Sequence, residues 1–134
     1  MFKLLFSAIN RVKSNYNILK KIIYLRKIRP KYLFFSENKK YQKYAYLLIE
    51  DLVKKHPNKV YYVSSDAEDK INNLNVINIF IGNGILMIIF FMIIRAQNIF
   101  LTLTALDNHA VKKTKNVDKY IYYFHGPVST TKVY

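Results

Sequence analysis

Residues 32–64, YLFFSENKKYQKYAYLLIEDLVKKHPNKVYYVS, contain two short apolar runs separated by an amphipathic segment. The runs at residues 32–35 and 60–64 are rich in aromatic and β-branched residues and are bounded by polar turns, which predicts buried strands. Between them, residues 40–55 predict a helix whose apolar side consists of Tyr44, Leu47, Leu48, Leu52 and Val53. A strand, a helix and a strand in succession indicate two parallel strands joined by a crossover helix.

The same alternation continues along the chain. Residues 76–81, 99–104 and 120–124 predict three further strands, and residues 85–95 predict a helix. The chain has 134 residues, of which 51% are hydrophobic and only three are glycine. This is enough for one domain with a real core, and too few turn residues for an all-β protein. The predicted class is therefore α/β, a Rossmann-like three-layer domain with a parallel sheet over residues 31–134.

An uninterrupted apolar run, residues 85–94, raises the question of a membrane span. A spanning helix needs about 20 apolar residues, whereas this run is bounded by Asn83 and Arg95. We therefore expect a crossover helix that is apolar on every side. Its outer side needs cover, which the amino-terminal segment, a lipid surface or a second domain could each supply.

Residues 1–30 form a basic leader. Residues 1–29 contain eight Lys or Arg and no acid, and apolar residues recur at spacings of three and four. This pattern predicts a basic amphipathic helix, either continuous or broken near Ser14 to Asn17, that ends before Pro30. The helix could lie on an anionic membrane surface or pack on its own domain, and the sequence leaves both interpretations open. A secretory signal is not expected, because basic residues are spread throughout the segment.

The net charge of +14 favours anionic partners. The chain has no cysteine, which excludes disulfides, thiolate catalysis and cysteine-based zinc or iron–sulfur sites. It has no GxxxxGK[ST] sequence, which disfavours a P-loop. No metal or cofactor is expected. Twelve tyrosines and a basic surface would suit single-stranded nucleic acid. The tyrosines nevertheless fall largely within strand and helix patterns, where burial explains them. We therefore do not expect nucleic acid to be the partner.

A histidine follows the last predicted strand. Residues 119–134, KYIYYFHGPVSTTKVY, contain an aromatic and β-branched run that predicts a buried strand, and then His125, Gly126 and Pro127. Ligands of open α/β sheets bind at the carboxyl edge of the strands, where unpaired backbone N–H groups converge. A neutral imidazole there could act as a general base toward an attacking hydroxyl. The alternative is a histidine whose ring only hydrogen-bonds a neighbouring loop.

Polar residues also follow the predicted fourth strand. Asp107, Asn108 and His109 belong to the same carboxyl edge, where Asp107 or Asn108 could contact a substrate or simply cap the next helix. His109 could be an ordinary solvated loop residue. Gly82-Asn83-Gly84 lies between a predicted strand and helix but lacks the third glycine of a dinucleotide fingerprint, which indicates a tight turn.

Five segments resemble a known family when they are taken in order: FFSENKKYQKYAYLLIEDL, VYYVSSDAED, FIGNG, LTLTALDNHAVKKT and YIYYFHGPVSTTKVY. They are similar to the amino-terminal half of CDP-glycerol glycerophosphotransferase-like proteins, the relatives of the teichoic-acid glycerophosphate primases and polymerases. The resemblance covers residues 32–134, about three quarters of the chain. It implies one half of a glycosyltransferase-B architecture, in which two Rossmann-like halves face a cleft.

The resemblance also implies an activity and a location. Such enzymes transfer glycerol phosphate from CDP-glycerol to a hydroxyl on a lipid-linked acceptor at the cytoplasmic face of the cell membrane. His125-Gly126 matches the family's strand-terminal His-Gly pair, which implies that His125 is the base and that Gly126 lies beside the substrate. Asp107 and Asn108 lie in a stretch that looks like the family's polar acceptor-side loop.

Two departures limit what the resemblance implies. The family more often continues after the glycine with Thr-Pro and a Lys, whereas here Pro127 follows directly and Lys132 comes later. The donor nucleotide is held mainly by a carboxyl-terminal domain that these residues do not include. We therefore expect a truncated or split member with negligible activity alone, which would need a separate nucleotide-binding domain. The alternative is a non-catalytic peripheral membrane-binding or interaction module.

Overall fold

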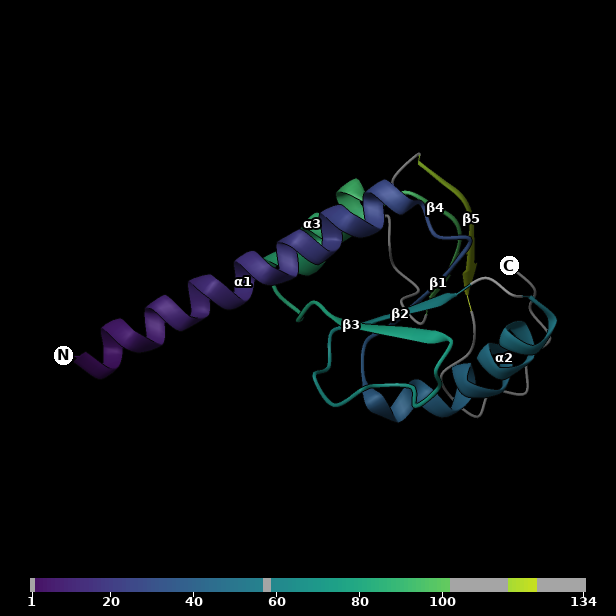
Figure 1. The fold of residues 1–134 in the computed structure, drawn as a ribbon, viewed down its shortest axis with the longest axis horizontal. Helices are drawn as coiled ribbons and strands as arrows, with labels where there is room; N and C mark the ends of the chain where they lie inside the picture. The colour runs from purple at the N-terminus through teal and green to yellow at the C-terminus, as the bar shows by residue number, and fades with distance from the viewer. Residues whose placement is uncertain (1, 57–58, 102–115, 123–134) are drawn as a thin grey trace.

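Five strands form one sheet in which every neighbouring pair runs parallel (Figure 1). The computed structural model describes residues 2–56, 59–101 and 116–122. The spatial order of the strands is β3-β2-β1-β4-β5. Their bounds are Tyr32–Ser36 (β1), Val60–Ser64 (β2), Val76–Phe80 (β3), Ala96–Leu101 (β4) and Val117–Tyr122 (β5). The predicted Rossmann-like α/β class with a parallel sheet is confirmed.

Helices cover both faces of this sheet. Their bounds are Phe2–Ile28 (α1), Gln42–Lys55 (α2) and Ile85–Ile93 (α3), and a 3₁₀ turn, Lys39–Tyr41 (η1), precedes α2. The crossover from β1 through α2 to β2 runs across the sheet in one direction, and that from β3 through α3 to β4 runs in the other. Crossovers of the same hand that run in opposite directions use opposite faces. Accordingly, α2 and α3 belong to different apolar clusters.

The core consists of these two clusters, one on each face. Side chains alternate along β1, so that Leu33 and Phe35 face α1 and α3, whereas Tyr32 and Phe34 face α2. Every residue of β1 and of β2 is buried, because both are inner strands that helices cover on both sides. The apolar runs at residues 32–36 and 60–64 are explained by this double burial.

α1 has a packed part and an unpacked part. Ile18, Ile22 and Leu25 are buried in the cluster that includes α3, and Figure 1 shows the carboxyl-terminal part of α1 beside α3. α1 therefore covers the apolar α3. In contrast, each of residues 2–17 is exposed, and this part of the helix extends beyond the sheet (Figure 1). The helix has no break at Ser14 to Asn17. Packing on its own domain thus accounts for the carboxyl-terminal part of α1 only.

The predicted end of α1 before Pro30 is confirmed. Arg29 has a φ of 47°, in the left-handed region that costs energy for a residue with a side chain. Its Nη2 donates to both carboxylate oxygens of Asp118, at 3.0 and 3.1 Å. This exposed ion pair joins the end of α1 to β5.

β4 begins three residues earlier than predicted, at Ala96, and α3 ends at Ile93 rather than at residue 95. The backbone N–H groups of Gln97 and Asn98 donate to the carbonyls of Pro30 and Lys31, at 2.9 and 3.1 Å. This pairing places polar residues in the strand. Residues 102–104 lie outside the described part of the chain. Among the helices of the described part, none has the length and apolarity needed to cross a bilayer.

β5 also begins early, at Val117, and it is the outermost strand of the described sheet. Asp118 and Lys119 are exposed, and Tyr120 and Ile121 are half-buried. The strand that was predicted to be buried is therefore only half-buried at Tyr120 and Ile121, whose side chains pack against the two core clusters. The reason is positional, since only β4 pairs with β5 among the described strands. Residues 123–124 of the predicted strand lie outside the described residues.

Candidate functional site

The predicted site residues lie outside the described part of the chain: Asp107, Asn108, His109, His125 and Gly126. The strands that precede them are described. Leu101 and Tyr122, the last residues of β4 and β5, are paired in the parallel ladder. These two strands therefore end at the same edge of the sheet, as predicted.

An open cavity of about 510 Å³ lies at this carboxyl edge, over the ends of β1, β2 and β3. Its lining comes from the loops after all three strands, from the last residue of β3 and from the first turn of α3: Glu37, Asn38, Ser65, Asp66, Ala67, Phe80, Asn83 and Met87. Parallel strands bring these loops together although they are distant in sequence. The carboxyl edge is where ligands of open α/β sheets bind, so the described residues supply a polar crevice at the expected place.

Asp66 joins two of the loops. Its Oδ2 accepts a hydrogen bond from the backbone N–H of Lys39 at 3.0 Å, and its Oδ1 accepts one from Glu68 at 3.1 Å. The backbone hydrogen bond from Lys39, and then that from Glu68, hold the pKa of the Asp66 carboxyl below its ordinary value of 3.8. Asp66 is therefore an anion at neutral pH, which can accept hydrogen bonds from a ligand but is poorly suited to take a proton.

Asp69 is a buried carboxylate, 3% exposed, beneath the same loop. Its Oδ1 accepts from the Tyr62 hydroxyl at 2.8 Å and from Gln42 Nε2 at 3.0 Å, and its Oδ2 accepts from Ser64 Oγ at 2.8 Å. Burying a carboxylate is costly unless hydrogen bonds replace its hydration. The three donors come from β2 and α2, so Asp69 fastens the loop after β2 to both elements.

Serines at the ends of β1 and β2 also join the loops that follow these two strands. Ser65 donates its backbone N–H to the Ser36 carbonyl at 3.0 Å and its Oγ to the Glu37 carbonyl at 2.7 Å. Ser36 and Ser64 are themselves buried at the ends of β1 and β2. The floor of the crevice is thus held by the side-chain hydrogen bonds of Asp69 and by the hydrogen bonds from Ser65 to backbone carbonyls. A preorganised floor of this kind is what a binding site requires.

The turn after β3 forms one side of the crevice. Gly82 has a φ of 76°, which a residue without a Cβ adopts at little cost. Asn83 lines the cavity, and α3 begins directly after Gly84. The interpretation of Gly82-Asn83-Gly84 as a tight strand-to-helix turn agrees with this geometry.

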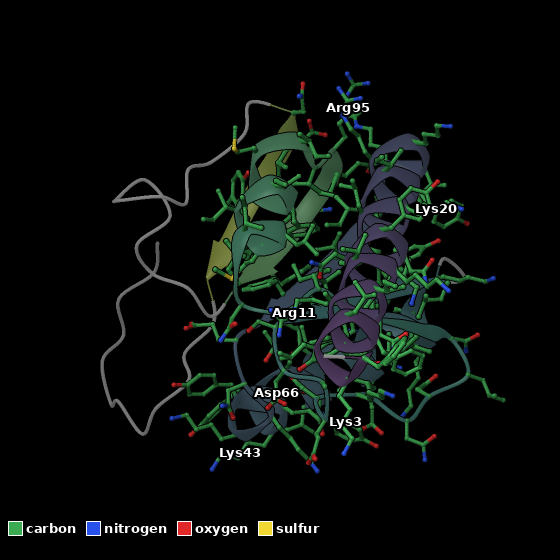
Figure 2. The ribbon with its side chains drawn as sticks, turned by 90° about the vertical axis from the view of Figure 1, so that its left-hand side faces the viewer. Lys3, Arg11, Lys20, Lys43, Asp66 and Arg95 are labelled. Carbon is green, nitrogen blue, oxygen red and sulfur yellow. The ribbon has the colours of Figure 1, made fainter. Side chains whose placement is uncertain are left out.

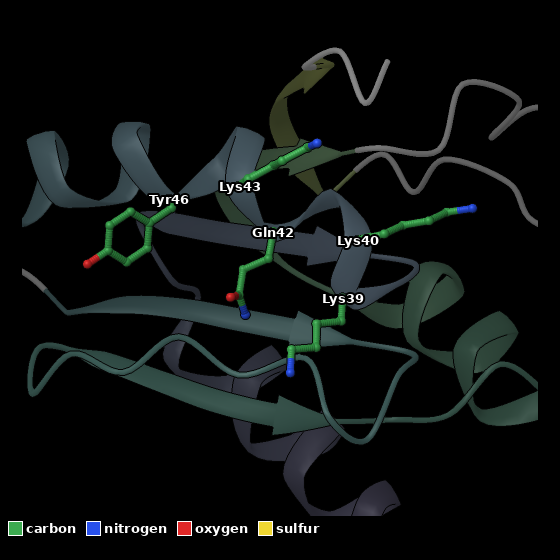
Figure 3. A pocket seen from close by; sticks show the side chains of 5 residues that line it. All are labelled: Lys39, Lys40, Gln42, Lys43 and Tyr46. Carbon is green, nitrogen blue, oxygen red and sulfur yellow. The ribbon is translucent and has the colours of Figure 1, made fainter. Parts of the chain in front are cut away.

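A second open cavity, of about 640 Å³, lies at the start of α2 and is lined by Lys39, Lys40, Gln42, Lys43 and Tyr46 (Figure 3). Figure 3 shows the three lysine side chains pointing in different directions. Gln42 is already engaged by Asp69 and by the Lys70 carbonyl, at 3.0 and 2.7 Å. Because the ammonium groups do not converge, they do not form a joint site for one anion.

The sequence pattern indicates only a polar turn after residues 60–64 and does not reveal the role of Asp69 in that turn. A signal was available, because Tyr62 and Ser64 occupy alternate positions of a strand that is otherwise apolar. Polar groups at such positions need buried partners. The identity of the partner, however, depends on how the loop folds back over β2.

No family model, no curated protein and no solved structure matches this chain. The geometry alone therefore defines the class, a Rossmann-like α/β domain with a polar crevice at the carboxyl edge of its sheet.

Proposed function

We propose that this chain forms the acceptor-side half of a transferase of the CDP-glycerol glycerophosphotransferase type, with His125 as the general base. The observation that supports it most is the parallel ending of β4 and β5 at the edge that also carries the polar crevice. The resemblance of residues 32–134 to that family supplies the substrate class. In this proposal the complete enzyme has a glycosyltransferase-B architecture.

The short connection between the end of β5 and His125 supports the proposed position of the base. His125 follows Tyr122 by three residues, which limits the distance between their Cα atoms to about 11 Å. Asp107 and Asn108 follow Leu101 by six and seven residues. Both segments can therefore contribute to one acceptor site beside the crevice.

The proposed chemistry is a phosphoryl transfer. The imidazole of His125 removes a proton from the acceptor hydroxyl, whose oxygen forms a bond to the glycerol-bearing phosphorus of CDP-glycerol. The bond from that phosphorus to the bridging oxygen breaks, and CMP leaves with the electron pair. Gly126, Asp107 and Asn108 would lie beside the acceptor.

This proposal requires two partners. The family resemblance implies that this chain would supply one wall of the cleft and that a nucleotide-binding domain would supply the other. The acceptor is lipid-linked, so the chain would work at the cytoplasmic face of the membrane. Its net charge of +14 would attract it to anionic head groups there.

Complementation tests the proposal. The chain is mixed with a separately purified carboxyl-terminal domain of a CDP-glycerol glycerophosphotransferase, CDP-glycerol and a lipid-linked acceptor, and CMP release is measured. We expect release from the mixture and negligible release from either part alone. Robust release by this chain alone would contradict the proposal.

Two histidine variants make the test specific to the base. His125→Ala is expected to lower the rate of the mixture by about 100-fold or more. The matched control is His56→Ala, because His56 lies between α2 and β2, at the opposite edge, where its ring is 5.3 Å from that of Tyr32. Equal losses from both variants would show that His125 has no special role.

A further inference from the structure

α1 carries a second apolar row that packs on nothing in the described structure. Its members alternate at spacings of three and four: Phe2, Leu5, Ile9, Val12, Tyr16, Leu19 and Ile23. These are the a and d positions of three successive heptads and the a position of a fourth, and we call them the heptad seam. Leu19 is half-buried, and the other six are 42–88% exposed.

The heptad seam faces away from the domain. At about 100° per residue, its mean direction is about 140° from that of Ile18, Ile22 and Leu25, the residues that pack on the core. α1 therefore uses one side to bind its own sheet and presents a different apolar side to solvent. Figure 1 shows the amino-terminal part of α1 standing clear of the rest of the fold.

Lysines flank the heptad seam in the same register. Lys13, Lys20 and Lys27 are seven residues apart and each follows a d position, so all three are e positions. Lys20 Nζ lies 4.7 Å from the centre of the Tyr16 ring, and its side chain thus lies along the seam. Viewed from the amino end of α1, Arg11 lies on the opposite side of the helix from Lys20 (Figure 2).

The width of the seam indicates what it binds. A helix that lies on lipid presents a broad apolar side with cations at its margins. Leu4 and Phe6 are also exposed and widen the apolar side before Val12. From Lys13 to Ile23, the apolar residues on this side of α1 are the a and d residues Tyr16, Leu19 and Ile23, and the lysine row lies directly beside them. A strict a/d row is the geometry by which one helix packs against another.

The exposed part of α1 also lacks the interactions that stabilise a helix in water. Residues 2–17 have no tertiary contact that buries a side chain, and the first turn contains Lys3 and no acid. A cation near the amino end opposes the helix dipole, and a single helix of this length is marginal in water. A second helix along the seam would supply the missing stabilisation.

A second copy of α1 is a poor match for the lysine row. Antiparallel copies would place the lysine rows against each other. Parallel copies would place them beside the g positions Ala8, Asn15 and Ile22, which carry no charge and give no attraction. We propose instead that the heptad seam forms a parallel coiled coil with a helix of another protein or domain that carries acidic residues at its g positions.

Two synthetic peptides test this proposal with the full chain. Both have four heptads with Ile at a and Leu at d; one has Glu at every e and g position, and its control has Lys there. Binding of the labelled peptides is measured by fluorescence anisotropy. We expect the Glu peptide to bind at least about 10-fold more tightly than the Lys peptide. Ile9→Asp should abolish binding, whereas the exposed off-seam variant Asn10→Asp should retain it.

Charge-reversal variants then distinguish the effect of the positions of the lysines on peptide binding from the effect of the total charge of the chain. Lys13→Glu, Lys20→Glu and Lys27→Glu together should reverse the preference toward the Lys peptide.

The charge-matched control combines Lys3→Glu, Arg11→Glu and Lys21→Glu, which lie at b, c and f positions away from the seam. This control should still prefer the Glu peptide. Equal effects of the two triple variants would overturn the proposal, because only total charge would then matter.

Other occupants of the seam would also overturn the proposal. One such result is self-association of the chain alone that Ile9→Asp abolishes. The other is that the chain does not bind the Glu peptide and instead inserts the heptad seam into vesicles that contain phosphatidylglycerol.

Discussion

Replacing Ile22 and Ile9, one at a time, by Ala tests the division of α1 into a packed and an unpacked part. Both are isoleucines in the interior of the same helix, so the change in helix propensity is the same for each. They differ in environment: Ile22 is 0% exposed in the core, whereas Ile9 is 45% exposed. Any difference between the two variants therefore reports tertiary packing.

The expected cost of Ile22→Ala is about 3 kcal/mol. Truncation of a fully buried isoleucine removes its transfer free energy and leaves a cavity, a loss in the range of about 2–5 kcal/mol. At Ile9 no cavity forms, and the better helix propensity of Ala offsets the small loss of burial, so the change should stay within about 0.5 kcal/mol.

Urea unfolding followed by circular dichroism measures both values. For a slope of about 2 kcal/mol per molar urea, Ile22→Ala should lower the midpoint by about 1.5 M and Ile9→Ala should leave it unchanged. A loss below about 1 kcal/mol for Ile22→Ala, or equal losses for the two variants, would refute the assignment of the carboxyl-terminal part of α1 to the core.

Two further predictions concern charged residues with unusual environments. Asp69→Ala should lower the free energy of unfolding by about 3 kcal/mol, because buried hydroxyl and amide donors lose their acceptor; a loss no larger than that of the exposed Glu68→Ala would contradict this. Arg29→Ala and Arg29→Gly both remove the ion pair with Asp118, but only glycine accommodates the positive φ without strain. In thermal unfolding, Arg29→Gly should therefore be more stable than Arg29→Ala by about 1 kcal/mol, and equal stabilities would argue against a left-handed Arg29.

The sheet could be predicted because its strands are separate apolar runs. Residues 32–36 and 60–64 are buried on both faces, and double burial produces an uninterrupted apolar run that sequence reasoning recognises. The start of β4 could not be predicted in this way. Gln97 and Asn98 join the strand because their backbone groups pair with residues 30–31, and a partner so distant in sequence leaves no local signal.

The leader helix shows a different limit. Spacings of three and four occur along α1 on two sides, since Ile18, Ile22 and Leu25 form one row and the heptad seam forms another. Periodicity predicts a helix with apolar sides but does not identify the side that packs on the domain. The edge position of β5 was missed for a related reason, because strand order is a property of the whole sheet.

The buried carboxylate of Asp69 marks a third limit. The polar run at residues 65–69 predicts a polar turn, and in the structure Ala67 and Glu68 are exposed, whereas Ser65 and Asp66 are half-buried. Asp69 differs because Tyr62 and Gln42 approach it from other elements. At the carboxyl edge, the sequence thus indicated where a crevice would form but not which side chains hold its floor.

The proposed function requires that His125 lies at the carboxyl edge of the sheet, beside the crevice. The chain has no cysteine, so spin labels can be attached at His125→Cys paired with either Ala67→Cys, after β2, or Lys59→Cys, before it. β2 has five residues and separates the two reference positions by about 16 Å along the sheet. Electron–electron double resonance should then give a distance from position 125 that is shorter to Ala67→Cys than to Lys59→Cys by about 7 Å or more. Equal distances, or a shorter distance to Lys59→Cys, would place His125 away from this edge and contradict the proposed function.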